Sequence, residues 1–259
     1  MIPRRKPKAP TVPIKTEEEI ECMRRAGHIV AMALRRIGEA LRPGVTTGEL
    51  NQVADLTIRS FGATPAFLNY RGYPATACIS LNEEVVHGIP GPRTVRPGDL
   101  VSVDLGAIVE GWYADAAFTY PVGEVSALAE RLMEAGQGGL EAGIAAARAG
   151  NRVRDIGAAI FDYVRARGFT VVRDLSGHGI GRRLHEEPHV PNYPEKGGTL
   201  VLEPGMTLAI EPMVNAGGAE VRLLEDGWTF VTRDVSLSVH YEHTVLIRED
   251  GPEILTALR

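Results

Sequence analysis

The chain has 259 residues, 44% of them hydrophobic and 24% charged, and a formal net charge of -5; this fits a globular domain with a large core of its own. The mild acidic balance excludes a strongly basic, DNA-binding body, and the lack of an apolar run of about 18 residues argues against a membrane span. The two cysteines, Cys22 and Cys78, lack the spacing of a disulfide framework or a zinc finger, so we expect a reducing, cytoplasmic location.

Residues 1–13 are basic and proline-rich, with cations at Arg4, Arg5, Lys6 and Lys8. They lack the apolar stretch of a secretory signal. Two interpretations stay open: a short flexible tail in solvent, or a weak contact with RNA or another acidic surface. In both cases we expect the folded domain over residues 14–259.

The helices and strands can be placed in chain order. Thr16 and Glu19 form a capping box, apolar residues at helical spacing run from Ile20 to Ile37, and the turn at residues 41–44 ends this first helix. Further helices are expected at residues 47–60, 126–149 and 153–167. Strands are expected at residues 75–80, 100–105 and 113–120, and short strands alternate with glycine turns in the last third. The pattern predicts a mixed α+β fold.

Two stretches of the chain resemble each other. Residues 96–104 and 203–211 both contain Pro-Gly before a strand and place a carboxylate, Asp104 or Glu211, at the same distance beyond the proline. Residues 41–44 and 147–150 resemble each other at nearly the same offset. Either common Pro-Gly turns coincide, or the chain has two related halves that each bring a carboxylate to a shared centre.

A pair of aspartates is expected on one sheet face. Alternation along residues 101–106 separates Asp104 from its apolar neighbours, and Glu110-Gly111 is a hairpin turn signal. With that turn as a two-residue loop, Asp115 lies opposite Gly106 and diagonal to Asp104, roughly 7–8 Å away. The pair is either exposed on the sheet surface or converges on a divalent cation that offsets its repulsion.

Three further residues favour the interpretation as a metal site. His178 lies between glycines, Glu211 ends an apolar strand, and Glu242 lies inside an expected strand at residues 239–245. Each alone has an ordinary structural explanation, but buried carboxylates need partners. Four carboxylates with one imidazole suit manganese, iron, cobalt or zinc, and a shared carboxylate is typical of two-metal sites.

The stretch His185-Glu186-Glu187-Pro188-His189 matches the letters of the zinc-protease motif H-E-x-x-H. That motif requires both histidines on one helical face. Pro188 breaks such a helix, so we reject this interpretation.

Separate motifs, in order along residues 15–258, resemble those of type I methionine aminopeptidases. They are Asn82–Pro90 (NEEVVHGIP), Asp104–Gly106 (DLG), Tyr113–Asp115 (YAD), Gly177–Gly181 (GHGIG), His185–Pro188 (HEEP), Ile210–Pro212 (IEP) and Tyr241–Thr244 (YEHT). The resemblance implies the pita-bread (creatinase/aminopeptidase) fold, with two pseudo-symmetric halves and helices outside a curved, mainly antiparallel sheet. A single catalytic domain would span residues 14–259, with halves at roughly 14–122 and 123–259.

Matched motif by motif, the family's metal ligands fall on Asp104, Asp115, His178, Glu211 and Glu242. The resemblance implies that Asp115 and Glu242 bridge two ions, that Asp104 completes one site, and that His178 and Glu211 complete the other. Glu211 would also take the proton of the attacking water. His87 would contact the substrate near its amine or scissile nitrogen, and His185 would stabilise the oxyanion. The substrate pocket would consist of Tyr70, Tyr73, Cys78, His87, Leu184, His185 and Trp228.

The resemblance also implies cofactors and partners. The cofactors would be two divalent ions (Co, Mn, Fe or Zn) and, as in some relatives, a monovalent cation near Asn82 and Ser238. The substrate would be the N-terminal methionine of nascent polypeptides with a small second residue. A monomer fits the family, and the basic tail could make a transient ribosome contact. Leu184 and the pair His240-Tyr241 depart from common family residues, which leaves the fine substrate preference open.

Three alternative functions fit the sequence less well. Proline-directed relatives usually carry a large N-terminal domain, and only a short segment precedes the first expected helix here. Type II methionine aminopeptidases carry a helical insert, for which the stretch between His178 and Glu211 has no room. A non-catalytic binding protein on this scaffold would be expected to lose metal ligands, whereas all five are present.

Overall fold

The computed structural model describes residues 12–257, so almost all of the basic tail expected over residues 1–13 lies outside the described range. The helices are α1 (Glu17–Ala40), α2 (Thr47–Ser60), the 3-10 turn η1 (Tyr70–Gly72), α3 (Ala127–Ala146) and α4 (Val153–Arg165). The strands are β1 (Thr64–Pro65), β2 (Ala77–Leu81), β3 (Glu84–Val86), β4 (Leu100–Val109), β5 (Trp112–Pro121), β6 (Thr170–Val171), β7 (Gly177–Gly179), β8 (Glu186–Val190), β9 (Thr207–Ile210), β10 (Met213–Asn215), β11 (Val221–Leu223), β12 (Phe230–Thr232), β13 (Ser238–His240), β14 (His243–Ile247) and β15 (Pro252–Ile254).

Helix ends follow local capping signals. Both parts of the capping box expected at Thr16 and Glu19 are present at the start of α1, and Thr46 with Glu49 caps α2 in the same way. Helices α3 and α4 end a few residues earlier than expected. After α4 the chain turns at Gly168, whose φ of 82° is a conformation that glycine adopts without strain.

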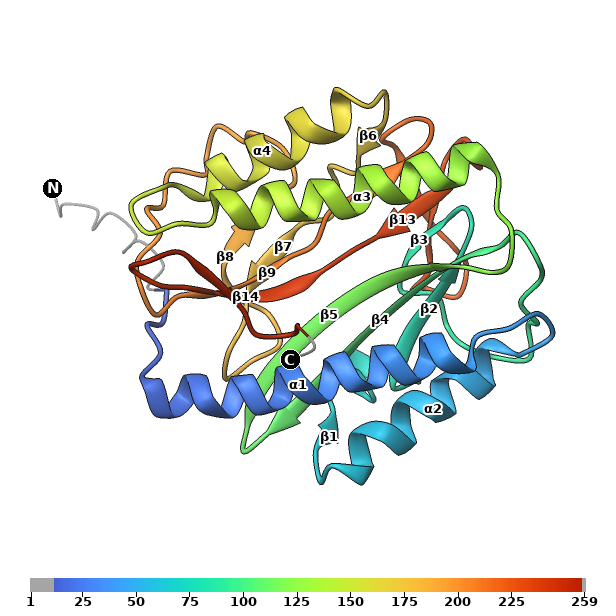
Figure 1. Cartoon of the computed structure of the whole chain (residues 1–259), viewed down its shortest axis with the longest axis horizontal. Helices are drawn as coiled ribbons and strands as arrows, with labels where there is room; N and C mark the ends of the chain where they lie inside the picture. The colour runs from blue at the N-terminus through green and yellow to red at the C-terminus, as the bar shows by residue number, and fades with distance from the viewer. Residues whose placement is uncertain (1–11, 258–259) are drawn as a thin grey trace, which may run out of the picture.

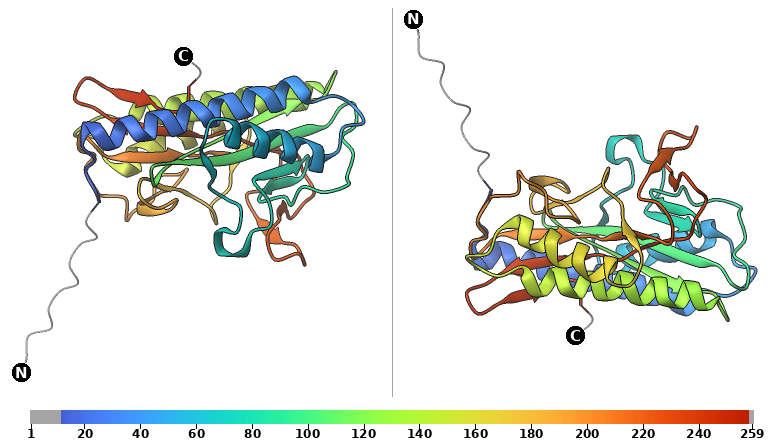
Figure 2. Two further views of the ribbon diagram at one scale, coloured as in Figure 1. Left: turned by 90° about the horizontal axis from the view of Figure 1, so that it is seen from below. Right: turned by 90° about the horizontal axis from the view of Figure 1, so that it is seen from above.

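The strands form antiparallel sheets of three to five strands, which together make one curved layer with the helices on one side of it. All strand pairings in the described range are antiparallel, and β4 and β5 form the longest hairpin. In Figure 1, α1 and α2 flank the strands at the bottom, and α3 and α4 flank them at the top. Figure 2 shows these helices in one layer, with loops, among them the hairpin of β11 and β12, projecting from the opposite side. The α+β pita-bread prediction is confirmed.

Equivalent hydrogen bonds recur in the two halves. The Gly44 N–H donates to the Val95 carbonyl at 2.8 Å, and the Gly150 N–H donates to the Leu202 carbonyl at 2.9 Å. Both glycines turn the chain after a long helix with nearly the same φ, 89° and 87°. The repeat seen in the sequence therefore has a counterpart in the backbone.

The two halves meet where β5 passes the junction of β13 and β14. The Thr244 hydroxyl accepts the Asp115 N–H at 2.9 Å and donates to the Asp115 carbonyl at 2.8 Å. Two residues further along β5, the Ala117 carbonyl accepts the Glu242 N–H at 2.9 Å. These bonds bring a carboxylate of each half to the centre of the sheet.

Alternation along β4 sends its apolar and polar side chains to opposite faces. Val101, Val103 and Leu105 are fully buried in the core under α1 and α2, as expected. A second core, which includes Leu132 and Ile160, lies between α3, α4 and the other half of the sheet. Asp104 lies on the opposite face of β4.

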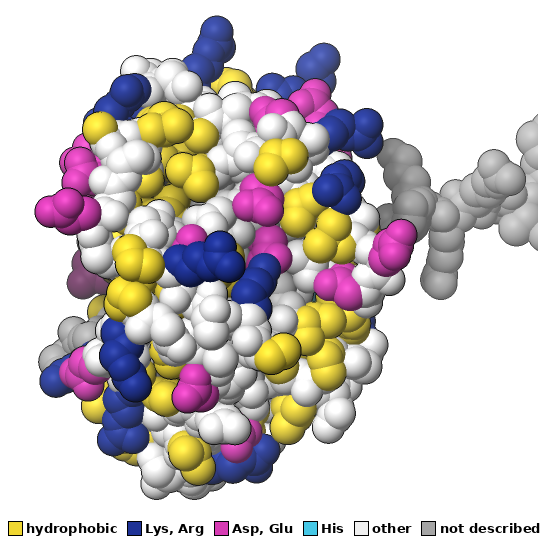
Figure 3. All heavy atoms as spheres, turned by 90° about the vertical axis from the view of Figure 1, so that its right-hand side faces the viewer, with side chains coloured by type: hydrophobic (Ala, Val, Ile, Leu, Met, Phe, Trp, Pro, Cys, Tyr) yellow, Lys and Arg dark blue, Asp and Glu magenta, His cyan; other side chains and the backbone are white. Residues whose placement is uncertain are grey.

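The surface carries charges of both signs. On the face drawn in Figure 3, basic and acidic side chains are interspersed with apolar ones. No helix within residues 12–257 is long and apolar enough to cross a membrane.

Candidate metal centre

The β4–β5 hairpin brings Asp104 and Asp115 together in the register expected from the sequence. Glu110 and Gly111 form its two-residue turn with positive φ values of 52° and 79°, as this turn type requires. Gly106 therefore pairs with Asp115. Both carboxyls are buried, and both line the same pocket. The hairpin prediction is thus confirmed, and the exposed alternative is excluded.

The second half of the chain supplies three more side chains. His178 comes from β7, Glu211 follows β9, and Glu242 lies between β13 and β14. The strand expected through residues 239–245 is instead divided at Tyr241 and Glu242. It divides because β13 pairs with β10 whereas β14 pairs with β9, so the chain changes partner there.

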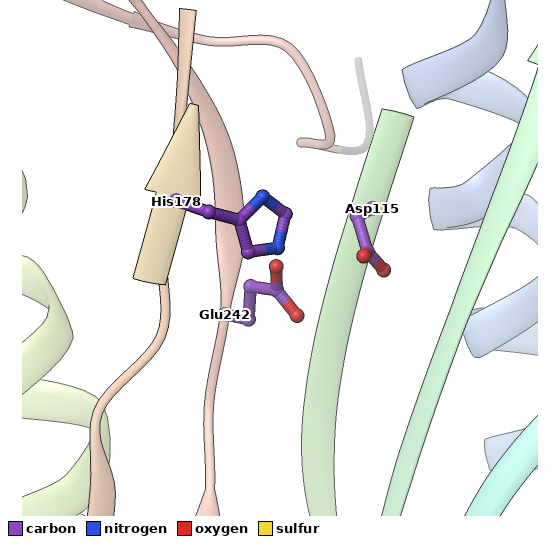
Figure 4. A group of neighbouring side chains, drawn as sticks. All are labelled: Asp115, His178 and Glu242. Atoms are coloured by element: carbon purple, nitrogen blue, oxygen red, sulfur yellow. The ribbon is translucent and has the colours of Figure 1, made fainter. Parts of the chain in front are cut away.

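All five side chains line one pocket. Figure 4 shows Asp115 on β5, His178 on β7 and Glu242 between β13 and β14 pointing toward one another, and one potential ligand atom of each lies within 4.8 Å of the others. His178 Nε2 lies 3.5 Å from Glu211 Oε1. The His178 Nδ1 lies 2.9 Å from the Gly179 carbonyl, which fixes the ring with Nε2 toward the pocket.

The electrostatics of this cluster favour a cation. Burial and the neighbouring acids raise the pKa values of Asp104, Glu211 and Glu242 well above their ordinary range, and burial raises the pKa of Asp115 to about 7. Burial lowers the pKa of His178 to about 3, so its imidazole is neutral, as a metal ligand must be.

Unpaired oxygens test whether these residues fit a metal ion. Asp104 Oδ1, Asp115 Oδ1 and Glu242 Oε1 are buried and have no hydrogen-bond partner among residues 12–257. Buried polar atoms are nearly always paired, and unpaired anions at this density are strongly unfavourable. Oxygen-rich sites with an imidazole suit divalent transition metals, so the residues present fit such ions.

The pocket residues expected from the resemblance lie around the same space. Tyr70, Tyr73, Cys78, His87, Leu184, His185 and Trp228 all line it, together with the five acidic and imidazole side chains. The Tyr70 hydroxyl lies 2.7 Å from His185 Nδ1. Partial burial, with Arg71 nearby, lowers the pKa of His185 to about 4, so this ring is neutral near pH 7.

His87 also lines this pocket. Its ring packs edge-to-face against Trp228 and Phe230, with centroids 6.5 and 6.0 Å away. Burial lowers its pKa. The Tyr73 hydroxyl donates to the Gly88 carbonyl at 2.9 Å, so this pocket residue is bonded to the residue that follows His87.

Three residues of the site were not predicted from the sequence. Phe67 and Arg71 also line the pocket. His240 is 1% exposed, and its Nε2 lies 3.6 Å from Glu211 Oε2 without a hydrogen-bond partner in the described part of the chain. Burial lowers the pKa of His240 to about 3. Its position two residues before Glu242, on the same strand face, was the signal that could have identified it.

Around Asn82, the side-chain amide is already engaged. Its Nδ2 donates to Asp99 at 3.0 Å, its Oδ1 accepts the Leu100 N–H at 3.0 Å, and its carbonyl accepts the Ser238 N–H at 2.8 Å. A monovalent cation near Asn82 and Ser238 stays a prediction.

The rejected zinc-protease motif is not helical. Residues Glu186–Val190 form strand β8, which pairs with β7. The two histidines of the motif therefore do not share a helical face, as expected from Pro188.

Comparisons with known proteins agree with this geometry. Residues 21–249 match metallopeptidase family M24. The chain is 48% identical over 246 residues to a methionine aminopeptidase of Clostridium perfringens, covering 95% of this chain and 99% of that protein. A methionine aminopeptidase of Thermotoga maritima superposes with a TM-score of 0.93 at 46% identity, covering 95% and 99% of the two chains. A prolidase of Pyrococcus furiosus superposes with a TM-score of 0.78 at 26% identity, over 95% of this chain and 66% of the prolidase.

Proposed function

The chain belongs to metallopeptidase family M24 and is a methionine aminopeptidase, and we propose that it removes the N-terminal methionine of nascent proteins and peptides by two-metal hydrolysis of the first peptide bond. The observation that carries the proposal is the buried cluster of four carboxylates and a neutral imidazole at the bottom of a largely apolar pocket. Its unpaired oxygens call for cations, and its walls suit an unbranched side chain.

The metal ligands in this proposal are Asp104, Asp115, His178, Glu211 and Glu242. Asp115 and Glu242 lie where β5 meets the junction of β13 and β14, and both would contact both ions. Asp104 would complete one site, and His178 with Glu211 the other. Divalent ions such as cobalt, manganese, iron or zinc would lower the pKa of a water molecule and polarise the scissile carbonyl.

Glu211 is the side chain to which we assign proton transfer. One of its oxygens faces His178 and the other faces His240, so the carboxylate is held between two imidazoles at the pocket wall. It would accept the proton of the attacking water and deliver it to the leaving amine.

His185 is placed to act on the substrate carbonyl. If the Tyr70 hydroxyl donates to His185 Nδ1, the neutral ring carries its proton on Nε2. That N–H would donate to the developing oxyanion. His87, which lines the same pocket, would contact the nitrogen of the scissile bond.

The pocket would hold the methionine side chain between Tyr73, Cys78, Leu184 and Trp228. Tyr73 and Trp228 meet edge-to-face at 5.1 Å, a surface that suits a thioether. On the more exposed side of the pocket, Tyr70 and His185 pack against each other with ring centroids 5.4 Å apart, and this pair would restrict the second residue to a small side chain.

A peptide panel tests the specificity. We expect the manganese-loaded enzyme to release methionine from Met-Ala-Ser, to act much more slowly on Met-Leu-Ser, and to leave Leu-Ala-Ser and N-acetyl-Met-Ala-Ser intact. The acetylated peptide tests whether the free amine is needed. Preferential cleavage of bonds that precede proline would instead assign the chain to the proline-directed branch of the family.

A further inference from the structure

A buried ion pair outside the metal centre joins the N-terminal segment to the loop that carries His185. Lys15 Nζ lies 3.0 Å from Glu186 Oε2, and the two side chains are only 1% and 3% exposed. Lysine and glutamate are rarely buried unless paired, because removing either charge from water is unfavourable. So unfavourable an arrangement calls for a role that a surface pair does not need.

Lys15 is anchored on the N-terminal side of the pair. Its backbone N–H donates to the Gly205 carbonyl at 2.9 Å, in the turn before β9. Its ammonium group also donates to the Pro13 carbonyl at 3.3 Å. The charge is therefore fixed relative to strand β9, which Glu211 follows.

Glu186 organises the loop on the other side. It directly follows His185, and its second oxygen accepts the Arg183 N–H at 3.1 Å. A Cβ at Gly181 would lie 2.6 Å from Lys15 Cε and about 3 Å from the Glu186 oxygens, so the loop backbone wraps closely around the ion pair. Residues 181–185 have no regular secondary structure and depend on such contacts for their shape.

We propose that the Lys15–Glu186 ion pair is a positioning element, which fixes the loop at residues 181–186 and so sets the places of Leu184 and His185 in the pocket. The inference rests on the proposed function, because those two side chains matter only if they hold and polarise the substrate. A displacement of about 1 Å at such groups can cost about 100-fold in rate.

A double variant distinguishes an ion pair that only stabilises the fold from one that positions the loop. Removing one partner leaves an unpaired buried charge, which destabilises the fold, whereas replacing both by apolar side chains of similar size is often neutral. The variant Lys15→Met/Glu186→Met therefore removes the charge without the penalty. It also removes the acceptor for the Arg183 N–H, so the loop loses its anchor.

The experiment compares the two single variants, the double variant and two matched controls in the full chain. The controls are Lys196→Met, at an exposed lysine, and Glu187→Met, at the exposed glutamate next to Glu186. We measure melting temperature, manganese binding by calorimetry, amide hydrogen exchange across residues 181–186, and methionine release.

We expect the double variant to regain a melting temperature near that of the wild type and to bind manganese as the wild type does. Its loop amides should exchange at least 10-fold faster, and kcat/KM should fall about 10-fold to 100-fold. Both controls should match the wild type.

Unchanged loop exchange in the double variant, or wild-type kinetics, would show that the pair serves stability alone and would overturn the proposal. Loss of manganese affinity in step with activity would also overturn it, because the defect would then lie in the metal centre. A wild-type enzyme that releases no methionine would refute the proposed function instead, and the exchange measurement would still decide whether the pair fixes the loop.

Discussion

The substitution Asp115→Asn should stabilise the metal-free protein while weakening the metal-loaded one. Asp115 is 4% exposed, and burial raises its pKa from an ordinary value of 3.8 to about 7. A raised folded-state pKa means that the protonated carboxyl contributes stability in full below about 3.8. That contribution is lost as the pH rises through about 7.

The magnitude follows from the shift. Between pH 5 and pH 7 the unfolded chain has lost this proton while the folded chain keeps it, so each pH unit costs about 1.4 kcal/mol, or about 3 kcal/mol over the interval. An asparagine of nearly the same shape cannot ionise. The unfolding free energy of the variant, relative to the wild type, should therefore rise by about 3 kcal/mol between pH 5 and pH 8.

The assay is urea denaturation in the presence of chelator, followed by circular dichroism at several pH values. Burial lowers the pKa values of His178 and His240 to about 3, so these histidines reduce the unfolding free energy as the pH falls below about 6.5. They do so in the wild type and in the variant, and their contributions cancel in the difference between the two proteins. With manganese present the order should reverse, because the variant lacks a ligand. A difference that stays flat across this pH range would refute the electrostatic reasoning.

Three further variants test individual roles. Glu211→Gln should keep the fold by circular dichroism and lower kcat for methionine release by at least about 100-fold, because it cannot accept a proton; near-normal turnover would remove this assignment. His185→Ala should lower kcat by about 100-fold to 1,000-fold, as expected for loss of an oxyanion donor, with manganese affinity by calorimetry unchanged; a matching loss of affinity would make it a metal-site residue. His240→Leu should weaken manganese binding by about 10-fold to 100-fold, because the Nε2 of His240 faces Glu211. The control His243→Leu should leave manganese binding unchanged, because the His243 ring hydrogen-bonds Thr256 instead. Equal effects of the two substitutions would indicate a general packing defect.

Local signals predicted much of the fold. The capping box at Thr16 and the Glu110-Gly111 turn each depend on a few neighbouring residues, so their outcome could be read from the chain alone. The turn then fixed the register that places Asp115 beside Asp104, because a one-residue slip would reverse every side chain of the strand.

Features that depend on distant partners were not predictable in this way. The strand around Glu242 divides because its two parts pair with different strands, a choice that alternation along the chain does not encode. For His240, the spacing from Glu242 was a local signal that it shares the strand face, but its orientation toward Glu211 depends on that same division. The Lys15–Glu186 pair joins residues far apart in sequence, and nothing local distinguishes Lys15 from an exposed lysine.

The most direct test of the metal centre uses metal-stripped protein, the peptide Met-Ala-Ser and added manganese or cobalt. We predict that free methionine and Ala-Ser appear only when metal is present, that cleavage stops after one residue, and that chelator abolishes it. Folded protein that releases no methionine with any divalent ion, or that releases it equally well in chelator, would contradict the assignment of these five side chains to a catalytic two-metal site.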